Sequence, residues 1–391
     1  MQLRNEKVAI IGGGPAGLML GRLLQGQGVD IKIYERDKDK YARWQGSALD
    51  MHHDTGLKAI TAAGLLENFK KLYRPGADKS VVVDSRMRVI KDDHLATGKE
   101  LTFGDELFRP EIDRGPLRDM LVSSIKEENI VWDARFTALK PSGTGWNIYF
   151  EDAPSAYADL VIAADGANSK LRKYLTDITP VYSGVTSIEG NIYRADINAP
   201  KIWGLAKGGS LFALENGKTI SFITKGDGTL TFLIGLERPE DWLAVSGIDL
   251  GNKQSVEAWF KEEFADWNSG WHELFSTDEV SFLPRVWYHF PQDQHWISQS
   301  NLTMIGDAAH RIPPYAGEGA NQALADALDL YETLCCEDFN TITEAISSFE
   351  HKMLLRSAAI TDETLKNTYG FHQGNNLQFL LNLFGVEAGD H

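Results

Sequence analysis

A glycine-rich turn between a strand and a helix is the feature that most constrains how this chain can fold. Residues 7–11 read KVAII, a β-branched run typical of a buried strand, and residues 12–17 read GGGPAG, which predicts a turn. Residues 18–25, LMLGRLLQ, predict a helix, and residues 30–36, DIKIYER, predict a second strand. Because a β-α-β crossover joins parallel strands, we expect a parallel sheet.

The same turn has the spacing of a dinucleotide-binding loop. Gly12, Gly14 and Gly17 satisfy the pattern G-x-G-x-x-G, whose glycines permit a tight turn and bring the backbone close to a pyrophosphate. The following helix N-terminus faces the negative charge, and an acid at the end of the second strand binds ribose hydroxyls. A turn without a ligand is the alternative, and it fits this context less well. The residues predicted to bind a dinucleotide here are Gly12, Gly14, Pro15, Ala16, Gly17, Glu35 and Arg36.

Two more strand–turn–helix patterns lie far along the chain. The strand ADLVIAA leads into Asp165, and the run LTMI leads into residues 306–321, GDAAHRIPPYAGEGAN. An Asp-Gly turn before a helix can serve simply as a helix cap. The first pattern therefore indicates a ligand site only in combination with the other glycine turns. Asp307 follows a strand and is therefore expected at the carboxyl end of the sheet, where open α/β sheets bind ligands.

The loop after Asp307 contains both conformationally permissive glycines and rigid prolines. Gly317 and Gly319 allow close backbone approach, and a helix beginning near Asn321 offers unpaired amide groups. Pro313 and Pro314 make the loop rigid and apolar. A purely structural loop is the alternative, and the two other glycine turns argue against it.

The middle of the chain has a different pattern. From about residue 180 to residue 285 it alternates in short segments such as GNIYRADI, TISFITKG and TLTFLIGL, which predict an antiparallel sheet. A long helix is predicted from Ile342 to Tyr369. We expect a Rossmann-like α/β domain at residues 1–175 and 286–340, an inserted antiparallel substrate domain at residues 176–285, and a bridging C-terminal helix at residues 341–391.

Composition excludes several classes of function. The net charge of −16 argues against a nucleic-acid partner. Cys335 and Cys336 are adjacent and poorly placed to bond each other, so a reducing cytoplasm fits best. The first apolar segment is too short and glycine-broken to span a membrane. No H-E-x-x-H, G-x-S-x-G or zinc-spaced cysteine pattern occurs, so we expect no metal and no catalytic triad. We also expect the protein to be a monomer.

The loops GGGPAG, DGANSKLR and GDAAHRIPPYAGEGAN, in this order, resemble the class A flavoprotein monooxygenases, the family of para-hydroxybenzoate hydroxylase. The resemblance covers roughly residues 6–335. It implies that the first loop and Glu35 bind the ADP half of FAD, that Asp307 contacts its ribityl or pyrophosphate part, and that the last loop follows the isoalloxazine ring. DGANSKLR is linked to both FAD and the nicotinamide cofactor. The residues thus added to the cofactor site are Asp165, Asp307, Pro314, Gly317, Gly319, Ala320 and Asn321.

Two segments, YERDKDKYARWQGSALDMH and PEIDRGPLRDML, look like those of the tetracycline-inactivating flavin monooxygenases. That resemblance associates Arg43 with NADPH and Asp50, Arg114 and Arg118 with FAD. Arginines suit phosphates and electron-rich rings. For Arg43, a surface ion pair is the structural alternative. Glu318 departs from the wider family, which commonly has Gln at this place.

The positions facing the substrate also depart from that group. Its inserted sheet carries a Gln, an Arg and a His, and Arg194, Ser210 and Thr231 are predicted at the matching places here. Unpaired buried polar groups are costly, so changed hydrogen-bonding groups predict a different substrate. Aromatic residues of the sheet are candidate lining, although strands also bury alternating aromatics as core. The predicted substrate-binding residues are Arg194, Ser210, Phe212, Phe222, Thr231, Pro314 and Tyr315.

The implied reaction is carried by the cofactor. NADPH or NADH reduces FAD, O2 adds to form a flavin C4a-hydroperoxide, and one oxygen atom passes to an electron-rich aromatic or polycyclic molecule, with a tetracycline-like compound among the candidates. No second nucleotide fingerprint is present, which favours transient docking of NAD(P)H. Hydroxylation and Baeyer–Villiger insertion both remain open. The W-x-W-x-I-P signature of flavin halogenases is missing, and a flavoprotein that only sequesters a ligand is the non-enzymatic alternative.

Overall fold

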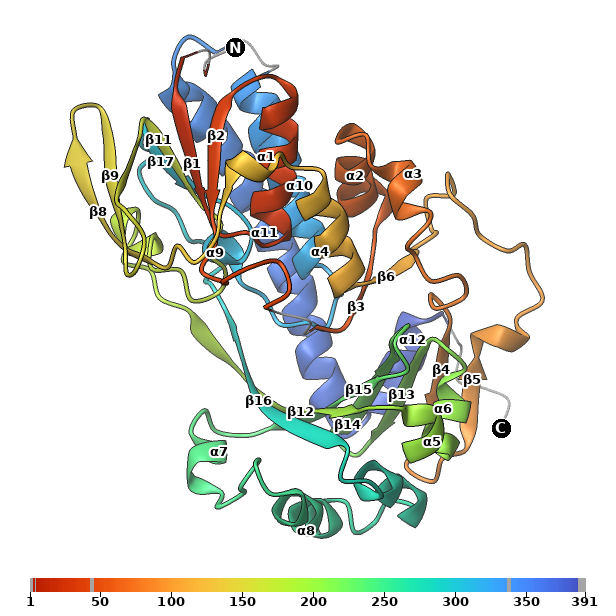
Figure 1. Ribbon diagram of the computed structural model, residues 1–391. Helices are drawn as coiled ribbons and strands as arrows, with labels where there is room; N and C mark the ends of the chain where they lie inside the picture. The colour runs from red at the N-terminus through yellow and green to blue at the C-terminus, as the bar shows by residue number, and fades with distance from the viewer. Residues whose placement is uncertain (1–2, 4, 43–45, 336–338, 386–391) are drawn as a thin grey trace. The chain divides into compact units, whose positions relative to one another are not determined.

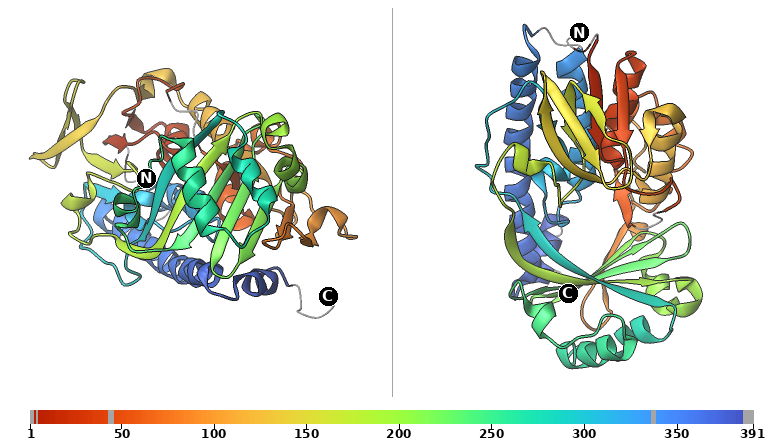
Figure 2. Two further views of the ribbon diagram at one scale, coloured as in Figure 1. Left: turned by 90° about the horizontal axis from the view of Figure 1, so that it is seen from below. Right: turned by 60° about the vertical axis from the view of Figure 1, so that its left-hand side comes forward.

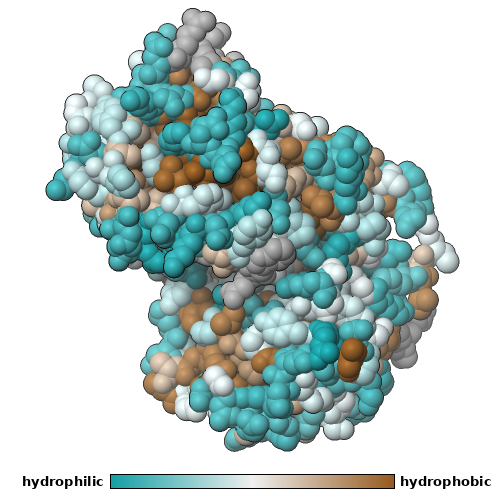
Figure 3. Space-filling model, viewed as in Figure 1, coloured by the Kyte–Doolittle hydropathy of each residue, from teal (hydrophilic) through white to brown (hydrophobic). Residues whose placement is uncertain are grey.

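The computed structural model describes residue 3 and residues 5–42, 46–335 and 339–385, and its chain forms two compact units (Figure 1). The first unit comprises residues 1–73, 102–181 and 289–363, and the second comprises residues 74–101, 182–288 and 364–391. Both are interleaved along the chain, as expected from an insertion. Most of the surface visible in Figure 3 is hydrophilic, in keeping with a charged fraction of 24%.

A five-stranded parallel sheet organises the first unit. Its order is β17-β11-β1-β2-β7, and all four pairs of neighbouring strands are parallel. The predicted parallel sheet is therefore confirmed. The central strands β1, after its exposed Lys7, and β11 are apolar and buried because both faces are covered. The strands are β1 (Lys7–Ile11), β2 (Asp30–Tyr34), β7 (Ile130–Val131), β11 (Leu160–Ala163) and β17 (Leu302–Met304).

Helices and a small antiparallel sheet cover this parallel sheet. Helix α1 packs against α10 and α4, and strands β9 and β10 contact β11 and β1 (Figures 1 and 2). The helices are α1 (Pro15–Gly26), α2 (Lys58–Ala62), α3 (Leu66–Phe69), α4 (Arg114–Ser123), α9 (Asp307–His310) and α10 (Gly319–Cys335), with short turns η1 (His53–Leu57), η3 (Glu127–Asn129) and η4 (Arg172–Tyr174). The antiparallel strands are β8 (Phe136–Ser142), β9 (Gly145–Phe150) and β10 (Ala156–Ala158), and the pair β3 (Ala48–Asp50) and β6 (Glu111–Asp113).

The second unit is built on a seven-stranded sheet of order β16-β12-β15-β14-β13-β4-β5. Neighbours β12–β15, β15–β14 and β14–β13 are antiparallel, as the alternating pattern predicts, whereas β13 and β4 are parallel. The strands are β4 (Ser80–Val83), β5 (Val89–Asp92), β12 (Val181–Ile192), β13 (Ser210–Glu215), β14 (Lys218–Thr224), β15 (Leu230–Glu237) and β16 (Val280–His289).

One face of this sheet forms an aromatic core with the helices laid over it. Phe222 stacks on Trp271 at 5.7 Å, and Phe232 lies 6.1 Å from Phe222. Gly190 is opposite Phe232 on β12, where a Cβ would lie 2.0 Å from the phenyl ring, so only glycine fits. The left view in Figure 2 shows α8 crossing the strands. The helices and turns are η2 (Asp93–Leu95), α5 (Ala195–Asn198), α6 (Pro200–Ala206), α7 (Trp242–Val245), α8 (Lys253–Glu263) and η5 (Ser269–Phe275).

Residues 74–101 correct the expected domain boundaries. The pattern assigns them to the first domain, but β4 pairs with β13, so the segment completes the sheet of the second unit. Within it, the segment SVVVDSRMRVI forms two antiparallel strands with a register shift between them. Backbone pairing between strands some 130 residues apart in sequence decides this, and local patterning carries no trace of it.

The expected long C-terminal helix is present as α11 (Ile342–His372), and α12 (Asn376–Leu383) follows it. From Thr364 onward these residues count with the second unit. Helix α12 contacts β13, where the Phe384 and Phe212 rings are 6.2 Å apart. None of the helices in the described part of the chain is both long and apolar enough to cross a membrane.

Candidate functional site

The three predicted loops meet at one edge of the parallel sheet. Ile11 is in register with Tyr34 and with Ala163, and Ala163 is in register with Met304. These residues end four neighbouring parallel strands, so their carboxyl ends share an edge. The residues that follow the strands there are Gly12, Glu35, Asp165 and Asp307. The prediction that Asp307 lies at the carboxyl end of the parallel sheet is confirmed, and a ligand at this edge stays a prediction.

The first loop forms a cradle of backbone. Gly12 has a φ of +116°, and a Cβ on it would lie 2.2 Å from the carbonyl oxygen of Ala164. A Cβ on Gly17 would lie 2.1 Å from the carbonyl oxygen of Gly12. Gly14 is different, because no heavy atom lies within 4 Å of its Cβ position. Gly14 caps α1 without a side-chain hydrogen bond, so this helix start offers amide donors toward open space and fits a phosphate.

Glu35 fixes the shape of this loop. Its Oε2 accepts a hydrogen bond from the Gly13 amide at 2.7 Å, and its Oε1 accepts one from the Asp37 amide at 3.0 Å. The side chain is buried at the end of β2. A ribose contact by Glu35 stays a prediction, and Arg36 beside it is exposed.

Asp165 supplies a second test of whether a cofactor fits. Its Oδ2 accepts a hydrogen bond from the Lys170 amide at 2.8 Å, while its Oδ1 is buried with no donor among the described residues. Burial raises the pKa of this carboxyl group despite those hydrogen bonds. Buried polar atoms are almost always paired, so this oxygen indicates a missing hydroxyl or amide donor. Together with the amide cradle, it fits a dinucleotide.

The arginines predicted to contact cofactors differ in their burial and in their partners. Arg118 donates to the carbonyl oxygen of Lys40 at 2.9 Å, pairs with Asp37 at 3.5 Å and lies over the ring of Trp132. Arg114 is exposed at the start of α4 and packs beside Gly46. Arg43 lies outside the described residues. Contacts of Arg114 and Arg118 with FAD remain predictions.

The third loop is tied to its surroundings by buried side chains. Asn321 is fully buried; its Oδ1 accepts from the His52 amide at 2.9 Å, and its Nδ2 donates to the Asp50 carbonyl at 2.8 Å. A Cβ on Gly317 would lie 2.9 Å from Asp50 Oδ1, so Asp50 contacts the loop directly. Helix α10 begins at Gly319, slightly earlier than expected. Asp307 and Pro314 are exposed, and Gly319, Ala320 and Tyr315 are half-buried.

His52 lies between two carboxylates beside this loop, an arrangement that sequence reasoning missed. Its Nε2 is 2.8 Å from Asp50 Oδ2, and its Nδ1 is 2.9 Å from Glu318 Oε1. Burial lowers the pKa of His52, but the hydrogen bonds to both carboxylates outweigh burial and raise the pKa to about 9. Burial raises the pKa of Glu318, yet His52 and Gln322 hold it below its usual value. The side chain that replaces the family's Gln is therefore the charged partner of an imidazolium.

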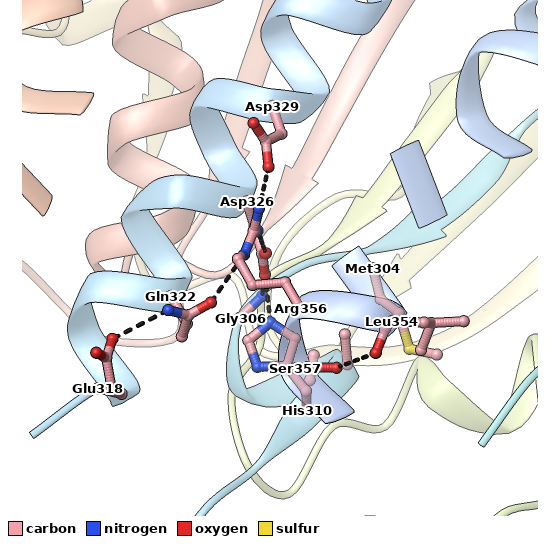
Figure 4. A network of polar contacts seen from close by, with 12 residues as sticks. Met304, Gly306, His310, Glu318, Gln322, Asp326, Asp329, Leu354, Arg356 and Ser357 are labelled. Carbon is pink, nitrogen blue, oxygen red and sulfur yellow. Dashed lines mark hydrogen bonds and ion pairs between the residues drawn. The ribbon is translucent and has the colours of Figure 1, made fainter. Parts of the chain in front are cut away.

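Glu318 is also the end of a longer polar network, shown in Figure 4. Gln322 Nε2 donates to Glu318 at 3.0 Å, and its Oε1 accepts from Arg356 Nε at 2.8 Å. Arg356, from α11, binds Asp326 at 2.6 Å and also pairs with Asp329. The network links α11 to the loop that the sequence assigned to the cofactor.

Asp326 connects this network to the strand end at Gly306. It is completely buried; its Oδ2 accepts from the Gly306 amide at 2.7 Å and lies 2.5 Å from His310 Nε2. Burial raises the pKa of Asp326, but His310 and Arg356 outweigh burial and leave it lowered. No sequence pattern joins these residues, which sit on four different segments.

Arg172, the last residue of DGANSKLR, also contacts the third loop. Its buried guanidinium donates to the carbonyl oxygens of Ala308 and Ala309, each at 3.0 Å, and lies 3.5 Å from the centre of the Phe290 ring. Burial lowers its pKa to about 10. This part of the motif therefore holds the neighbouring loop in place.

The predicted substrate residues of the second unit fall into three groups. Ser210, Phe212 and Thr231 share the face of the sheet opposite the aromatic core. Phe222 belongs to that core and is fully buried, so it does not line the other face. Arg194 follows β12, is exposed and binds Glu279. The alternation of β14 points Phe222 inward, and the strand ends before Arg194, which is why both depart from expectation.

Comparison with known proteins agrees with a flavin site. A family model described as FAD binding domain matches residues 5–107 and 130–364. The chain is 26% identical to the monooxygenase asqM of Emericella nidulans over 380 residues, covering 84% of this chain and 83% of that protein. It is 27% identical to the 3-amino-4-hydroxybenzoate 2-monooxygenase PtnB3 of Streptomyces platensis over 373 residues, covering 94% and 88%. The crystal structure of the tetracycline destructase Tet(55) superposes with a TM-score of 0.76 at 16% identity, covering both chains completely.

The fold and the three loops thus define a class, the flavin-dependent oxidoreductases with a parallel-sheet nucleotide unit. The chain belongs to the FAD-binding domain family. With its named relatives, it is an FAD-dependent monooxygenase, as its resemblance to the class A enzymes implied. The structural likeness to Tet(55) shows a shared fold.

Proposed function

We propose that this enzyme uses NADPH or NADH and O2 to insert one oxygen atom into an electron-rich aromatic or polycyclic small molecule. The observation that carries the proposal is the meeting of the three loops at one sheet edge, where the amide cradle at Gly14 and the orphan Asp165 Oδ1 fit a dinucleotide. The named relatives support it, because asqM is named a monooxygenase and PtnB3 a 3-amino-4-hydroxybenzoate 2-monooxygenase.

The chain's own residues bind and orient in this proposal. FAD, when bound, supplies electron transfer and activation of O2. The amides at the start of α1 would hold its phosphates, and Asp165 Oδ1 would be available to accept a hydrogen bond from it. His52 holds protons on both ring nitrogens between Asp50 and Glu318, and so keeps a positive charge beside Gly317 and its loop. Asn321, Asp326 and Arg356 keep that loop in one conformation.

The reductant is expected to dock transiently, because the glycine pattern for a dinucleotide occurs once in the sequence. We also propose that the enzyme works as a monomer in the cytoplasm, where its adjacent cysteines stay reduced. The expected assignment of Arg43 to NADPH is part of this proposal.

The substrate is an electron-rich ring compound. A relative acts on an aminohydroxybenzoate and a protein of the same fold on tetracyclines. The test is aerobic NADPH and NADH oxidation by the FAD-loaded enzyme across phenols, hydroxybenzoates, aromatic polyketides and tetracyclines, with peroxide measured separately. We expect substrate-stimulated oxidation coupled to a product heavier by one oxygen. Oxidation that yields peroxide alone with every compound would refute the proposal.

Baeyer–Villiger insertion is the second candidate reaction for the same site. Hydroxylation and insertion add the same mass, so the product structure must be solved by NMR. A lactone or ester product would establish insertion, and a new hydroxyl group on an intact carbon skeleton would establish hydroxylation.

A further inference from the structure

The sheet of the second unit has one face without an apolar covering layer along its β12, β15 and β16 strands. The core face carries residues such as Ile188, Phe232 and Ile234, which are 0–1% exposed. On the opposite face most of the residues are polar, and all except the buried Thr231 are partly exposed. They are Ser210 on β13, Ser221 and Ile223 on β14, Thr231 and Leu233 on β15, Glu189 and Asn191 on β12, and Arg285 on β16.

Helices from the C-terminal segment cover only part of this face. His372 Nε2 lies 3.4 Å from Thr219 Oγ1, and Phe384 contacts Phe212, so the covered positions are on β13 and at one end of β14. In the next two rows across the sheet, Ser221 is in register with Leu233 and Glu189, and Ile223 with Thr231 and Asn191. A polar row in a sheet needs either water or a ligand to pair its groups.

Arg285 is a basic side chain of this face, and four of its five N–H donors have no acceptor among the described residues. Its Nε donates to Glu189 Oε2 at 2.7 Å. Neither Nη1 nor Nη2 has an acceptor among the described residues, although the side chain is only 41% exposed. Arg238 and Arg194 in the same unit use their Nη atoms to bind Glu263 and Glu279. The Nε end of the Arg285 guanidinium is therefore fixed by Glu189, whereas Nη1 and Nη2 remain available to a ligand.

A chain of hydrogen bonds holds Arg285 in this orientation. Thr231 Oγ1 donates to Asn191 Oδ1 at 2.8 Å, and Asn191 Nδ2 donates to Glu189 Oε1 at 3.3 Å. Both oxygens of Glu189 are thus engaged, and its side chain is 17% exposed. A guanidinium already ordered by such partners loses less conformational entropy when it binds a ligand.

We propose that the free Nη1 and Nη2 donors of Arg285 bind a singly charged anionic group of the substrate, a carboxylate or an enolate. The planar fork matches a carboxylate with two parallel hydrogen bonds. Glu189 neutralises part of the charge, so the site favours a monoanion over a phosphate. The inference rests on the proposed function, since it names the class of molecule that this oxygenase accepts. It also explains how a sheet with Ser210 and Thr231 recognises a polar substrate without a base at either position.

The test compares matched acids and neutral amides. Probes are salicylate with salicylamide, 4-hydroxybenzoate with 4-hydroxybenzamide, and 3-amino-4-hydroxybenzoate with its carboxamide, titrated into FAD-loaded enzyme by calorimetry and by the flavin absorbance change. We expect the wild type to bind at least one acid about tenfold or more tightly than its amide. In Arg285→Gln that preference should vanish through loss of acid affinity, while amide affinity changes less than about threefold.

Arg88→Gln is the matched control. Arg88 also binds a carboxylate, Asp84, through its Nε in the same unit, but its side chain is 69% exposed and lies beside β5. It should leave both affinities unchanged. Glu189→Gln, which keeps the shape but loosens the hold on Arg285, should weaken acid binding less than Arg285→Gln does. FAD content and melting temperature show whether each variant folds.

Several outcomes would overturn the inference. They are equal binding of acid and amide by the wild type, equal loss of both in Arg285→Gln, or no acid in the panel bound at all. Oxygenation of neutral polycycles, unaffected by Arg285→Gln, would reject this inference and leave the proposed function standing. Arg285-dependent acid binding without any oxygenated product would do the reverse.

Discussion

At the scale of the residue, the glycines of the first loop do two different things. Gly12 and Gly17 are required by the chain itself, because neighbouring carbonyl oxygens occupy the space beside them. No contact within the protein requires glycine at position 14, since no heavy atom lies within 4 Å of its Cβ position. The pattern G-x-G-x-x-G predicts all three, but only packing separates the glycine that serves the fold from the one that faces a ligand.

This difference predicts opposite effects for two similar substitutions. Gly14→Ala should leave the unfolding free energy of the apoprotein nearly unchanged and weaken FAD binding about tenfold, because the methyl group enters the phosphate cradle. Gly17→Ala should destabilise the apoprotein by about 1–3 kcal/mol, because backbone must move. Urea unfolding and FAD titration measure the two effects.

Gly26→Ala, at the other end of α1 and with no neighbour within 4 Å, is the control. It should stabilise the helix by up to about 1 kcal/mol and leave FAD affinity unchanged. Equal FAD affinity in Gly14→Ala and wild type would contradict the assignment of the cradle.

His52 predicts a dependence of stability on pH. Its pKa of about 9 lies above the unfolded value of about 6.5, so its stabilisation is complete below pH 6.5 and is lost as pH rises through 9. The unfolding free energy of wild type minus that of His52→Gln should therefore fall between pH 6 and pH 9.5, by on the order of 1–3 kcal/mol. Urea titrations at several pH values measure the difference.

His53→Gln serves as the control, because His53 is a more exposed neighbour that pairs with exposed Asp54. Its loss of unfolding free energy should stay below about 1 kcal/mol, as for other exposed pairs. A difference for His52→Gln that does not change with pH would show that Asp50 and Glu318 do not hold His52 protonated.

At the scale of the element, helix α11 is connected to the cofactor loops through the side chain of Arg356. Arg356 compensates Asp326, which is completely buried and binds the Gly306 amide at the end of β17. Helix propensity and apolar patterning predict α11, but they do not predict which charged residue faces inward. That depends on the carboxylate that α10 presents to it.

Removing Arg356 takes one cationic partner from the buried carboxylate of Asp326 and leaves it with His310. Arg356→Gln should lower the unfolding free energy by about 3–5 kcal/mol, and the loss should shrink at low pH as Asp326 becomes protonated. FAD affinity should fall too, because Asp326, the acceptor of the Gly306 amide, is held less firmly without Arg356. Thermal unfolding with and without added FAD provides both readouts.

Arg135→Gln breaks an exposed pair with Glu151 and should cost less than about 1 kcal/mol. If both variants lost the same stability, the buried network would have no special role.

At the scale of the whole molecule, cofactor loops and the last helix belong to different units. Helix α12 contacts β13, and Asn376 at its start is completely buried, donating to the carbonyl oxygens of Lys218 and Phe371 at 3.0 Å each. The predicted cofactor-binding glycines all lie in the first unit.

Deletion of residues 375–391 should therefore act mainly on the second unit. We expect unchanged FAD content per chain and several-fold weaker binding of an aromatic substrate probe, as measured by flavin absorbance and calorimetry. Asn376→Ala should reproduce part of the effect. Equal loss of FAD and of probe affinity would count against this separation.

The sequence by itself determined the parallel sheet, the position of three loops at its edge and the alternating sheet inserted between them. Each of these is set by local patterns of glycine spacing and apolar periodicity, which need only neighbours in the chain. The tertiary structure alone decided that residues 74–101 join the second sheet, that Phe222 is core, and that His52, Glu318, Gln322 and Arg356 form one network. Those contacts join residues up to 266 positions apart, and the energy of burying and pairing charges is set by whichever groups the fold brings together.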